Sequence, residues 1–365
     1  MQVGSPGHAH VRVLALSRYD RLGASSRIRM FQYEQALAIE GVEVTFSPLL
    51  PDSYLMRQYT GQPVNWPELA GAYARRLCAL FSARHFDLVW LEKELFPSLP
   101  AWFEHLLNSG GVRYVVDFDD AVFHNDLIKP NPFKRLLSRK IDAVMQDAVM
   151  TVCGNDYIAR RATDAGAHHV RILPSVIDLD RYRVRERHVR DGVVIGWIGS
   201  PSTAPYLNLA LPALRKLALL HPISLRVIGG QFNAPGLNVE CRPWAESTEA
   251  LEISDFDIGI MPLFDTPWER GKCGYKLIQY MACGRPVVAS PIGINKEIVQ
   301  PGRNGYLAST DAQWLSALET LCSQPEVSQA LGAQGRRDVE QRYCIQVTAP
   351  RLADIFREAL RSCPR

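Results

Sequence analysis

Short apolar runs alternate with longer amphipathic segments along the whole chain. In the first half, the apolar runs that predict strands are Val11–Ser17, Val42–Pro48, Asp87–Leu91, Tyr114–Asp117, Met150–Cys153 and Val170–Leu173. The segments between them have apolar residues at helical spacing. The helix expected from about Ser25, for example, has Met30, Phe31, Leu37 and Ala38 on its apolar face. Strands that alternate with helices in this way predict an α/β fold with a doubly wound parallel sheet.

The same alternation starts again after a break at Pro174–Asp178 and a charged stretch, Arg181–Arg190. The strands predicted for this second series are Val193–Ile198, Ser224–Ile228, Val239–Cys241, Ile258–Pro262 and Pro286–Ser290. Helical periodicity then continues in Asp311–Cys322, Glu326–Arg342 and Thr348–Leu360. We therefore predict two Rossmann-like halves that face a central cleft. Ligands of open α/β sheets bind beyond the carboxyl ends of the strands, so the site is expected there.

Length and charge agree with this organisation. A chain of 365 residues fits two domains. Its 41 basic and 38 acidic residues give a net charge of +3, which excludes a general nucleic-acid binder with a basic field over its whole surface. Of the basic residues, 33 are arginines, whose forked donors suit phosphates. A GC-rich genome would produce the same bias.

The eight cysteines are dispersed, without a CxxC pair or a Cys/His cluster at zinc spacing. This distribution argues against structural zinc and is typical of reduced thiols in a cytosolic protein. The first ten residues lack the apolar core of a signal peptide, and no apolar run approaches the ~20 residues of a membrane span. We expect a cytoplasmic chain, at most peripheral to the inner face of a membrane.

Two loops at predicted strand ends are suited to anions. The first follows the opening strand and consists of Gly23, Ala24, Ser25, Ser26 and Arg27. Its small residues let a ligand approach the backbone amides, although a plain turn with serine as the helix N-cap explains it equally well. The second opens the other half with Gly199, Ser200, Pro201, Ser202 and Thr203. It lacks the G-x-G-x-x-G spacing, which disfavours a nicotinamide dehydrogenase.

The run Tyr280–Ser290 (YMACGRPVVAS) resembles the donor-binding motif of the retaining glycosyltransferases of family 4. Further similarities to that family extend over nearly the whole chain, in Pro174–Asp178 (PSVID), Asp257–Leu263 (DIGIMPL) and Asn304–Leu307 (NGYL). The resemblance implies the GT-B fold, with an acceptor domain at residues 1–178 and a nucleotide-sugar donor domain at 179–345. It also implies that a final helix, in residues 346–365, crosses back onto the first domain.

One departure from the family pattern affects the donor loop. Many members have a Glu-x7-Glu pattern, whose first glutamate touches the sugar and whose second binds the ribose hydroxyls. Alignment on the Met-Ala-x-Gly block places Gly271 and Gln279 at these two positions. Gln279 can still hydrogen-bond to a ribose, but Gly271 has no side chain with which to reach a sugar. Glu269 is near in sequence but out of register.

The resemblance also assigns donor-binding roles. It places Lys276 at the donor phosphates, where a fixed cation beside helix amides can replace a metal. The alternative for Lys276 is a solvated helix lysine. The donor loop further comprises Lys272, Cys273, Gly274 and Tyr275. The segment Val239–Trp244 is similar to the family loop whose backbone reads the nucleobase, which gives Arg242, Pro243 and Trp244 as candidates, although Trp244 is nearly as well explained by packing.

Clustered carboxylates end a predicted strand of the first half, at Asp117–Asp120. Carboxylates at a strand tip are costly unless solvated, paired or metal-bound, so a site is favoured over a core role. By position, Asp119 or Asp120 is the candidate for contacting the donor sugar or the acceptor hydroxyl. His124 is a weaker candidate, because a lone histidine is more often structural. For Glu92–Glu94, a solvated charge run is favoured over a role in lining the acceptor side.

These expectations describe a retaining glycosyltransferase that uses a nucleotide sugar, with UDP- or GDP-sugar as the expected donor, and neither a metal nor a cofactor. The acceptor is left open between a glycan, a lipid-linked sugar and a small molecule. The basic stretches Lys134–Lys140 and Arg181–Arg190 are either solvated faces or a docking site for an anionic membrane that carries the acceptor. The alternatives for the function are a GT-B-like sugar-nucleotide epimerase and a non-catalytic binding or scaffold protein.

Overall fold

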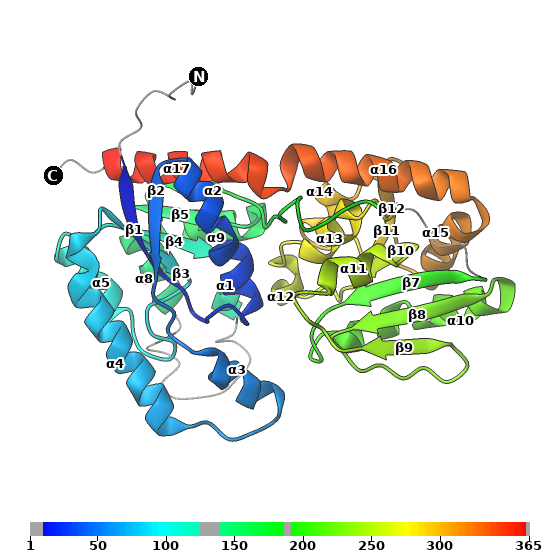
Figure 1. Ribbon diagram of the computed structural model, residues 1–365, viewed down its shortest axis with the longest axis horizontal. Coiled ribbons are helices and arrows are strands. Elements are labelled where there is room, and N and C mark those ends of the chain that lie inside the picture. The colour runs from blue at the N-terminus through cyan, green and yellow to red at the C-terminus, as the bar shows by residue number, and fades with distance from the viewer. Residues whose placement is uncertain (1–9, 125–136, 138, 186–190, 363–365) are drawn as a thin grey trace. The chain divides into compact units, whose positions relative to one another are not determined.

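The computed structural model describes residues 10–124, 137, 139–185 and 191–362. The first nine residues, most of the basic stretch Lys134–Lys140 and residues 186–190 of the second basic stretch lie outside the described residues. The chain forms two compact units. Unit 1 comprises Met1–Ser175 and Thr348–Arg365, and unit 2 comprises Val176–Val347 (Figure 1).

Unit 1 is built on a parallel sheet with the strand order β2-β1-β3-β4-β5-β6. Its strands are β1 (Val11–Leu16), β2 (Val42–Phe46), β3 (Leu88–Glu92), β4 (Tyr114–Phe118), β5 (Met150–Cys153) and β6 (Val170–Ile172). Its helices are α1 (Ala24–Arg29), α2 (Glu34–Ile39), α3 (Asp52–Tyr59), α4 (Trp66–Ser82), α5 (Trp102–Ser109), α8 (Lys140–Asp147), α9 (Asp156–Asp164) and most of α17 (Ile345–Arg361). Short 3₁₀ turns lie at Phe31–Tyr33, Ala83–His85 and Val122–His124.

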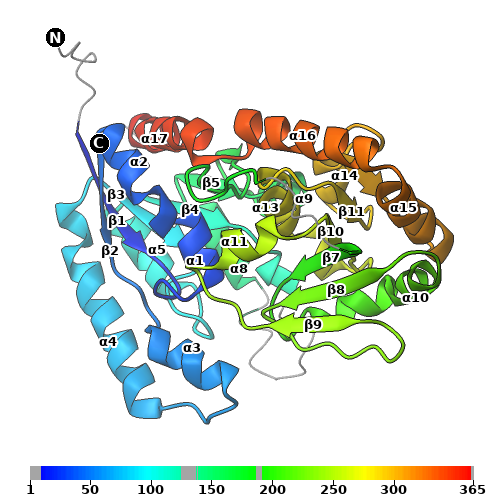
Figure 2. The same cartoon turned by 45° about the vertical axis from the view of Figure 1, so that its right-hand side comes forward.

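Unit 2 repeats the architecture with the order β12-β11-β10-β7-β8-β9, again parallel throughout (Figure 2). Its strands are β7 (Val193–Ile198), β8 (Ile223–Ile228), β9 (Val239–Arg242), β10 (Ile258–Met261), β11 (Val287–Ala289) and β12 (Gly305–Leu307). Its helices are α10 (Leu211–Leu220), α11 (Glu249–Ser254), α12 (Pro267–Arg270), α13 (Tyr275–Ala282), α14 (Asn295–Ile298), α15 (Asp311–Ser323) and α16 (Pro325–Arg342). In chain order this is the 3-2-1-4-5-6 arrangement of a Rossmann sheet.

The central strands are apolar because helices cover both faces of each sheet. Every residue of β3 (LVWLE) and β4 (YVVDF) is buried, including the acidic residue near the end of each strand. Continuous apolar runs of this kind are what parallel strands covered on both faces require. The predicted α/β class and the two doubly wound sheets are therefore confirmed.

The C-terminal segment completes the core of unit 1. Phe356 of α17 is fully buried, and its ring centroid lies 5.3 Å from that of Trp90 in β3. The hydroxyl groups of Tyr33 and Thr348 are 2.8 Å apart, and the Arg357 guanidinium donates to the carbonyl of Glu40. In Figure 1, α17 accordingly lies beside α2.

The helix expected from Ser25 is not continuous. α1 ends at Arg29, Met30 leaves the helical conformation at φ −125° and ψ −67°, and α2 begins only at Glu34. The interruption has a packing reason. Arg29, Met30, Phe31 and Tyr33 are all buried, which is more than one face of a straight helix can bury within five positions.

Arg29 and Asp117 form a buried ion pair behind this bend. The guanidinium donates from Nε to Oδ1 at 2.8 Å and from Nη2 to Oδ2 at 3.0 Å, while Nη1 donates to the carbonyl of Leu173 at 2.9 Å. Both side chains are only 1% exposed. Burial raises the pKa of Asp117 above its ordinary value, although the Arg29 charge acts in the opposite direction. The pair joins α1, β4 and the end of β6.

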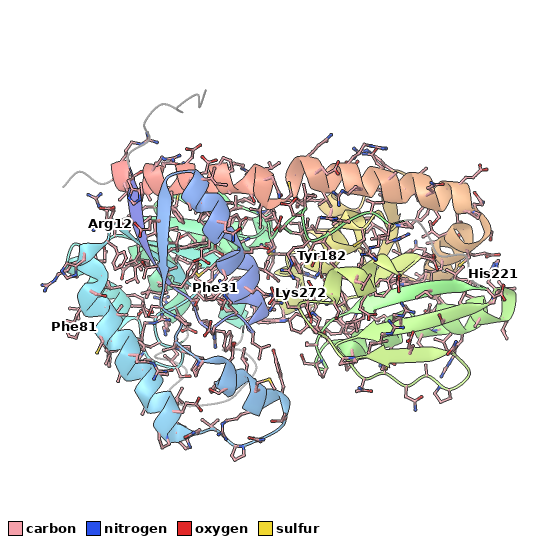
Figure 3. All side chains as sticks on the ribbon, viewed as in Figure 1. Arg12, Phe31, Phe81, Tyr182, His221 and Lys272 are labelled. Carbon is pink, nitrogen blue, oxygen red and sulfur yellow. The ribbon has the colours of Figure 1, made fainter. Side chains whose placement is uncertain are left out.

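We expect Arg29→Met to destabilise the protein by about 3–5 kcal/mol, because it leaves the Asp117 carboxylate buried without its partner. Denaturant unfolding followed by fluorescence measures the loss, and Arg29→Met/Asp117→Asn should recover part of it. Arg12→Met is the control: its ion pair with Asp87 is about half exposed, so the change should be ~1 kcal/mol or less (Arg12 is labelled in Figure 3). Equal losses for Arg12→Met and Arg29→Met would contradict this assignment.

Candidate functional site

The carboxyl ends of β1, β3 and β4 bring together a polar cluster in unit 1. β1 has β2 on one side and β3 on the other, so the direction in which strands are added reverses there. Such reversals are where open α/β sheets bind ligands. The cluster consists of Ser25 and Ser26 from α1, Glu92 and Lys93 at the end of β3, and Asp119 just after β4.

Lys93 is the centre of this cluster. It is 5% exposed, and its ammonium lies 2.8 Å from Asp119 Oδ1 and donates to Ser25 Oγ at 2.9 Å. The Ser25 hydroxyl in turn donates to Asp119 Oδ2. The backbone of Lys93 has φ +62°, in the left-handed region, which costs a non-glycine residue about 1–2 kcal/mol. The surrounding contacts therefore hold Lys93 in a conformation that it would not adopt alone.

Lys93 and Asp119 keep their charges at neutral pH. Burial acts to lower the pKa of Lys93, but the carboxylates of Asp119, Asp120 and Glu92 outweigh it and raise that pKa. Burial acts to raise the pKa of Asp119, yet the Lys93 charge and the hydrogen bonds from Lys93 and Ser25 leave it below its ordinary value. An ionised Asp119 beside an ammonium is an acceptor of hydrogen bonds from hydroxyl groups.

The expectation that Glu92–Glu94 is a solvated charge run is wrong. Glu92 is 1% exposed and accepts from Ser26 Oγ at 2.6 Å and from the backbone amide of Arg18 at 2.7 Å. Glu94 pairs with the Lys140 ammonium at 2.6 Å, and Lys140 is itself 5% exposed. Lys140 therefore belongs to neither a solvated nor a membrane-facing surface. The charged residues of this segment do not by themselves indicate, in the sequence, which partners they have.

The first anion loop has a different local structure from the one expected. Gly23 is the N-cap of α1, without a side-chain cap, so neither serine takes that role. A Cβ at Gly23 would meet Tyr19 Cβ at 2.3 Å, so packing alone requires this glycine. Arg27 donates from Nη1 to the carbonyls of Arg21 and Leu22, at 3.0 and 3.4 Å. Nucleotide binding by Gly23, Ala24, Ser25 and Arg27 stays a prediction.

His124 lies at the edge of this region. Its Nε2 is 2.8 Å from the hydroxyl of Tyr157, and its ring packs beside Phe123. Burial, and then the Arg161 charge, lower the pKa of His124, which favours the neutral imidazole. Asp120 is half-buried and interacts electrostatically with Lys93. Of the predicted acidic candidates, Asp119 is thus the one that the structure places at the centre of the cluster.

In unit 2 the reversal in strand order falls between β7 and β10, and Lys276 lies at that point. Its ammonium is 5.2 Å from the ring centroid of Trp197, in β7. A Cβ at Gly199 would approach the same ring to 2.5 Å and Thr203 Oγ1 to 2.8 Å. The Lys276 ammonium and the Gly199–Thr203 loop therefore both lie next to the Trp197 ring, although they are more than 70 residues apart in the sequence.

The helix that follows this loop is a 3₁₀ helix, with Thr203 as its N-cap. Ser200 to Thr203 form a turn in which Thr203 Oγ1 donates to the Ser200 carbonyl at 3.1 Å. A 3₁₀ helix follows at Ala204–Leu209, and α10 begins at Leu211. Pro205 and Pro212 lie in the first positions of these two helices. Because proline lacks an amide hydrogen, it fits a first turn but would break one continuous helix through this region.

The segment predicted to be the donor loop has a charged residue on each side of Gly271, Arg270 and Lys272. Glu269, 6% exposed, hydrogen-bonds with the hydroxyls of Tyr206 and Thr266. The Lys272 ammonium lies 5.7 Å from the ring centroid of Trp268, and Cys273 is buried. Gly274 is the N-cap of α13 at φ +66°, and a Cβ there would meet Ile298 Cδ1 at 2.3 Å, so glycine is required at this position. Tyr275 begins α13.

Gln279 and Trp244 are connected by hydrogen bonds through Tyr182 and Glu249, two residues that the sequence analysis did not identify. Gln279 Nε2 donates to the hydroxyl of Tyr182 at 2.8 Å, and that hydroxyl donates to Glu249 Oε1 at 2.5 Å. The indole N–H of Trp244 donates to Glu249 Oε2 at 2.6 Å. Arg242 pairs with Glu240 and Glu252, and Pro243 is exposed. Nothing in the sequence around Tyr182 or Glu249 marks either residue as part of a site.

The structure also bears on metals and membranes. In the part of the chain that is described, no group of three or more His, Cys, Asp or Glu side chains is arranged to hold a metal ion. Within the same residues, none of the helices has the length and apolar character needed to cross a membrane.

Comparisons with known proteins give the same fold. Residues 192–324 match the family model "Glycosyl transferases group 1". D-inositol 3-phosphate glycosyltransferase from Saccharomonospora viridis is 27% identical over 263 residues, which are 63% of this chain and 60% of that protein. This chain thus spans less than two thirds of the length of that curated relative.

Among solved structures, sucrose-phosphate synthase from Thermosynechococcus elongatus superposes with a TM-score of 0.70 at 14% identity, over 97% of this chain and all of that one. HepE from Anabaena, solved in complex with UDP-glucose, gives 0.67 at 13% identity, over 96% of this chain and all of that one. The two Rossmann-type sheets and these superpositions define the GT-B fold. The chain is therefore similar to the group 1 glycosyl transferases over residues 192–324 and has the GT-B fold.

We expect Lys93→Met to destabilise unit 1 by about 3 kcal/mol, because it leaves Asp119 ionised and largely buried, with its side chain 13% exposed, opposite an apolar side chain. Lys93→Met/Asp119→Asn should be more stable than Lys93→Met, since the unpaired charge is then removed as well. Urea unfolding measures both, with the exposed Lys216→Met as the control. If the double variant were no more stable than Lys93→Met, the ion pair would not be the interaction that Lys93 provides.

Proposed function

We propose that the chain is a retaining glycosyltransferase that moves a sugar from a nucleotide-sugar donor to an acceptor hydroxyl without a metal ion. Unit 2 binds the donor and unit 1 the acceptor. The family supports the class of reaction, and the retention of stereochemistry follows from the family alone. UDP-sugars are the first donors to test, because HepE is described with UDP-glucose, and GDP-sugars are the second.

The position of Lys276 is the observation that supports this function best. Its ammonium lies over Trp197 at the reversal between β7 and β10, next to the Gly199–Thr203 loop. When the bond between the sugar and the nucleotide breaks, negative charge grows on the diphosphate. A cation that is already fixed beside that group stabilises the transition state more than the ground state. Lys272, three residues before α13, is the second candidate cation of the same loop.

The cluster in unit 1 suits the acceptor. The Asp119 carboxylate, held by Lys93 and Ser25, can accept a hydrogen bond from a sugar or polyol hydroxyl. Asp120, half-buried next to it, is the candidate to orient the hydroxyl that attacks. The candidate acceptors are a glycan, a lipid-linked sugar and a small molecule, each of which offers such a hydroxyl. Contact with a membrane would be needed only for a lipid-linked acceptor.

We expect Lys276→Ala to lower kcat by roughly 10²–10³, because one preorganised charge opposite the leaving group is lost. Transfer of radiolabelled sugar to acceptor, together with release of nucleoside diphosphate, measures the effect. Lys216→Ala removes an exposed lysine of α10 in the same unit and should leave kcat unchanged. A Lys276→Ala variant with wild-type kcat would exclude a role for Lys276 in stabilising the leaving group.

A thermal-shift panel of UDP-, GDP-, ADP- and TDP-sugars should identify the donor. A ligand present at 100 times its Kd stabilises the folded state by about 2.7 kcal/mol, which is easily measured. We expect that EDTA changes neither the shift in melting temperature produced by the best donor nor the turnover with that donor. Loss of turnover in EDTA that Mg²⁺ or Mn²⁺ restores would show that the reaction needs a metal. The absence of any shift would favour the non-catalytic alternative.

A further inference from the structure

A buried chain of hydrogen bonds in unit 2 joins Gln279 to Glu249. Gln279 is 2% exposed, Tyr182 is 1% exposed and Glu249 is 6% exposed (Tyr182 is labelled in Figure 3). The order of contacts is Gln279 Nε2 to Tyr182 hydroxyl at 2.8 Å, Tyr182 hydroxyl to Glu249 Oε1 at 2.5 Å, and Trp244 Nε1 to Glu249 Oε2 at 2.6 Å. We call these four residues the relay.

The hydrogen bonds of the relay all run in one direction, with each donor pointing toward Glu249. An indole N–H only donates and an ionised carboxylate only accepts, so Glu249 is the acceptor at both of its oxygens. The single proton of Tyr182 therefore points to Glu249. Burial, and then the neighbouring Tyr275 and Glu249, raise the pKa of Tyr182 well above its ordinary value, so its hydroxyl keeps this proton. The Tyr182 oxygen can then only accept from Gln279, which must turn its NH₂ group toward Tyr182.

The backbone on both sides of this contact is fixed by one arginine. Arg336 of α16 donates from Nη1 to the carbonyl of Tyr182 and to the carbonyl of Ala282, at the end of α13, each at 2.5 Å. The segment before β7 and the helix that contains Gln279 are thus held together independently of the relay. A change in the relay should alter the orientation of the Gln279 amide more than the position of its backbone.

The orientation of the amide determines what Gln279 can offer a ligand. With its NH₂ group on Tyr182, Gln279 presents Oε1 on the other side, and no described residue donates to this oxygen. A carbonyl oxygen accepts a hydrogen bond from a hydroxyl as one oxygen of a carboxylate does. A glutamate at this position would instead compete with Glu249 for the one proton of Tyr182.

We infer that Tyr182 and Glu249 are positioning residues: they fix the Gln279 amide so that Oε1 accepts a hydrogen bond from a ribose hydroxyl of the donor. Glu249 then also accounts for a glutamine at position 279, where the family pattern that this chain resembles has glutamate. The inference rests on the proposed function for the presence of a ribose. The direction of the relay itself depends only on the contacts within unit 2.

Nucleotide analogues without a hydroxyl proton test the orientation. The probes are UDP (or GDP, if it binds more tightly) and its 2′-fluoro-2′-deoxy and 3′-fluoro-3′-deoxy forms, with Kd measured by calorimetry on the full chain. Fluorine cannot donate, so at least one analogue should bind the wild type roughly threefold to tenfold more weakly than the parent nucleotide. In Tyr182→Phe and Glu249→Gln the Gln279 amide can turn. The ratio of the Kd of the analogue to the Kd of the parent nucleotide should therefore fall toward one. Glu246→Gln, on an exposed neighbour, should keep the wild-type ratio.

Reversing the relay provides the second test. Gln279→Glu alone should lower the melting temperature by several degrees, because two buried carboxylates then face one hydroxyl proton. Glu249→Gln/Gln279→Glu should restore both the melting temperature and the discrimination against fluorine. In this double variant the new amide at position 249 would donate to Tyr182, and Tyr182 would donate to the new carboxylate at position 279. Trp244 would still donate to the side-chain oxygen at position 249.

The outcomes separate the two proposals. If the wild type binds no nucleotide, the proposed function and the ribose contact are overturned together, while the melting temperatures still decide the direction of the relay. If the wild type binds and discriminates but Tyr182→Phe and Glu249→Gln keep its ratio, the positioning role is overturned and the proposed function stands. A double swap no more stable than Gln279→Glu would contradict the direction of the relay.

Discussion

Parallel pairing determines where the chemistry of this protein can lie. Because each pair of neighbouring strands in both sheets is parallel, the chain must return across a face of the sheet before the next strand begins, and all carboxyl ends emerge at one edge. The faces are covered by helices and hold apolar side chains. Polar groups are therefore concentrated at the ends of a few strands. Glu92 and Lys93 follow this rule in unit 1, as do Gly199 and the donor loop in unit 2.

Several charges are buried at these edges, and each is held by contacts from other elements. Lys93 is paired with Asp119, Arg29 with Asp117, and Lys140 with Glu94. Burying an ion pair gains little stability compared with apolar packing, so such pairs are weak evidence for a purely structural role. Their effect here is to fix the orientation of the paired side chains and of the groups that hydrogen-bond to them. Sites that act on developing charge need that rigidity, since groups that must reorient during the reaction contribute less.

Much of the fold could be predicted from the sequence, because buried parallel strands are continuous apolar runs whatever their surroundings. The strands at Val193–Ile198 and Met150–Cys153 begin and end where the pattern places them. The helix from Ser25 could not be delimited, because its interruption at Met30 reflects packing against distant residues. The sites follow the same division. Strand ends indicated Asp119 and Gly199, and the resemblance to the family indicated Lys276, while nothing local distinguished Lys93 from a solvated lysine.

Tyr182 and Glu249 were missed for a related reason. They are 67 residues apart, and their meaning depends on a hydrogen bond that only the folded chain forms. The resemblance to the family pattern implies that Gln279 stands where glutamate is usual, but comparing this one position does not explain the difference. The explanation lies in Glu249, which accepts a hydrogen bond from Tyr182, the residue to which Gln279 donates. Buried polar chains in general have this property, since the direction of each bond is set by the residue at the far end.

The discontinuity of unit 1 has a consequence for synthesis of the protein. Its sheet is encoded before residue 175, but the side chains that cover Trp90 and Tyr33 come from residues beyond Val347. During translation, the first unit emerges with part of its core uncovered and stays so while some 170 residues of unit 2 are made. The core of unit 1 can therefore be completed only after the whole of unit 2 has been synthesised.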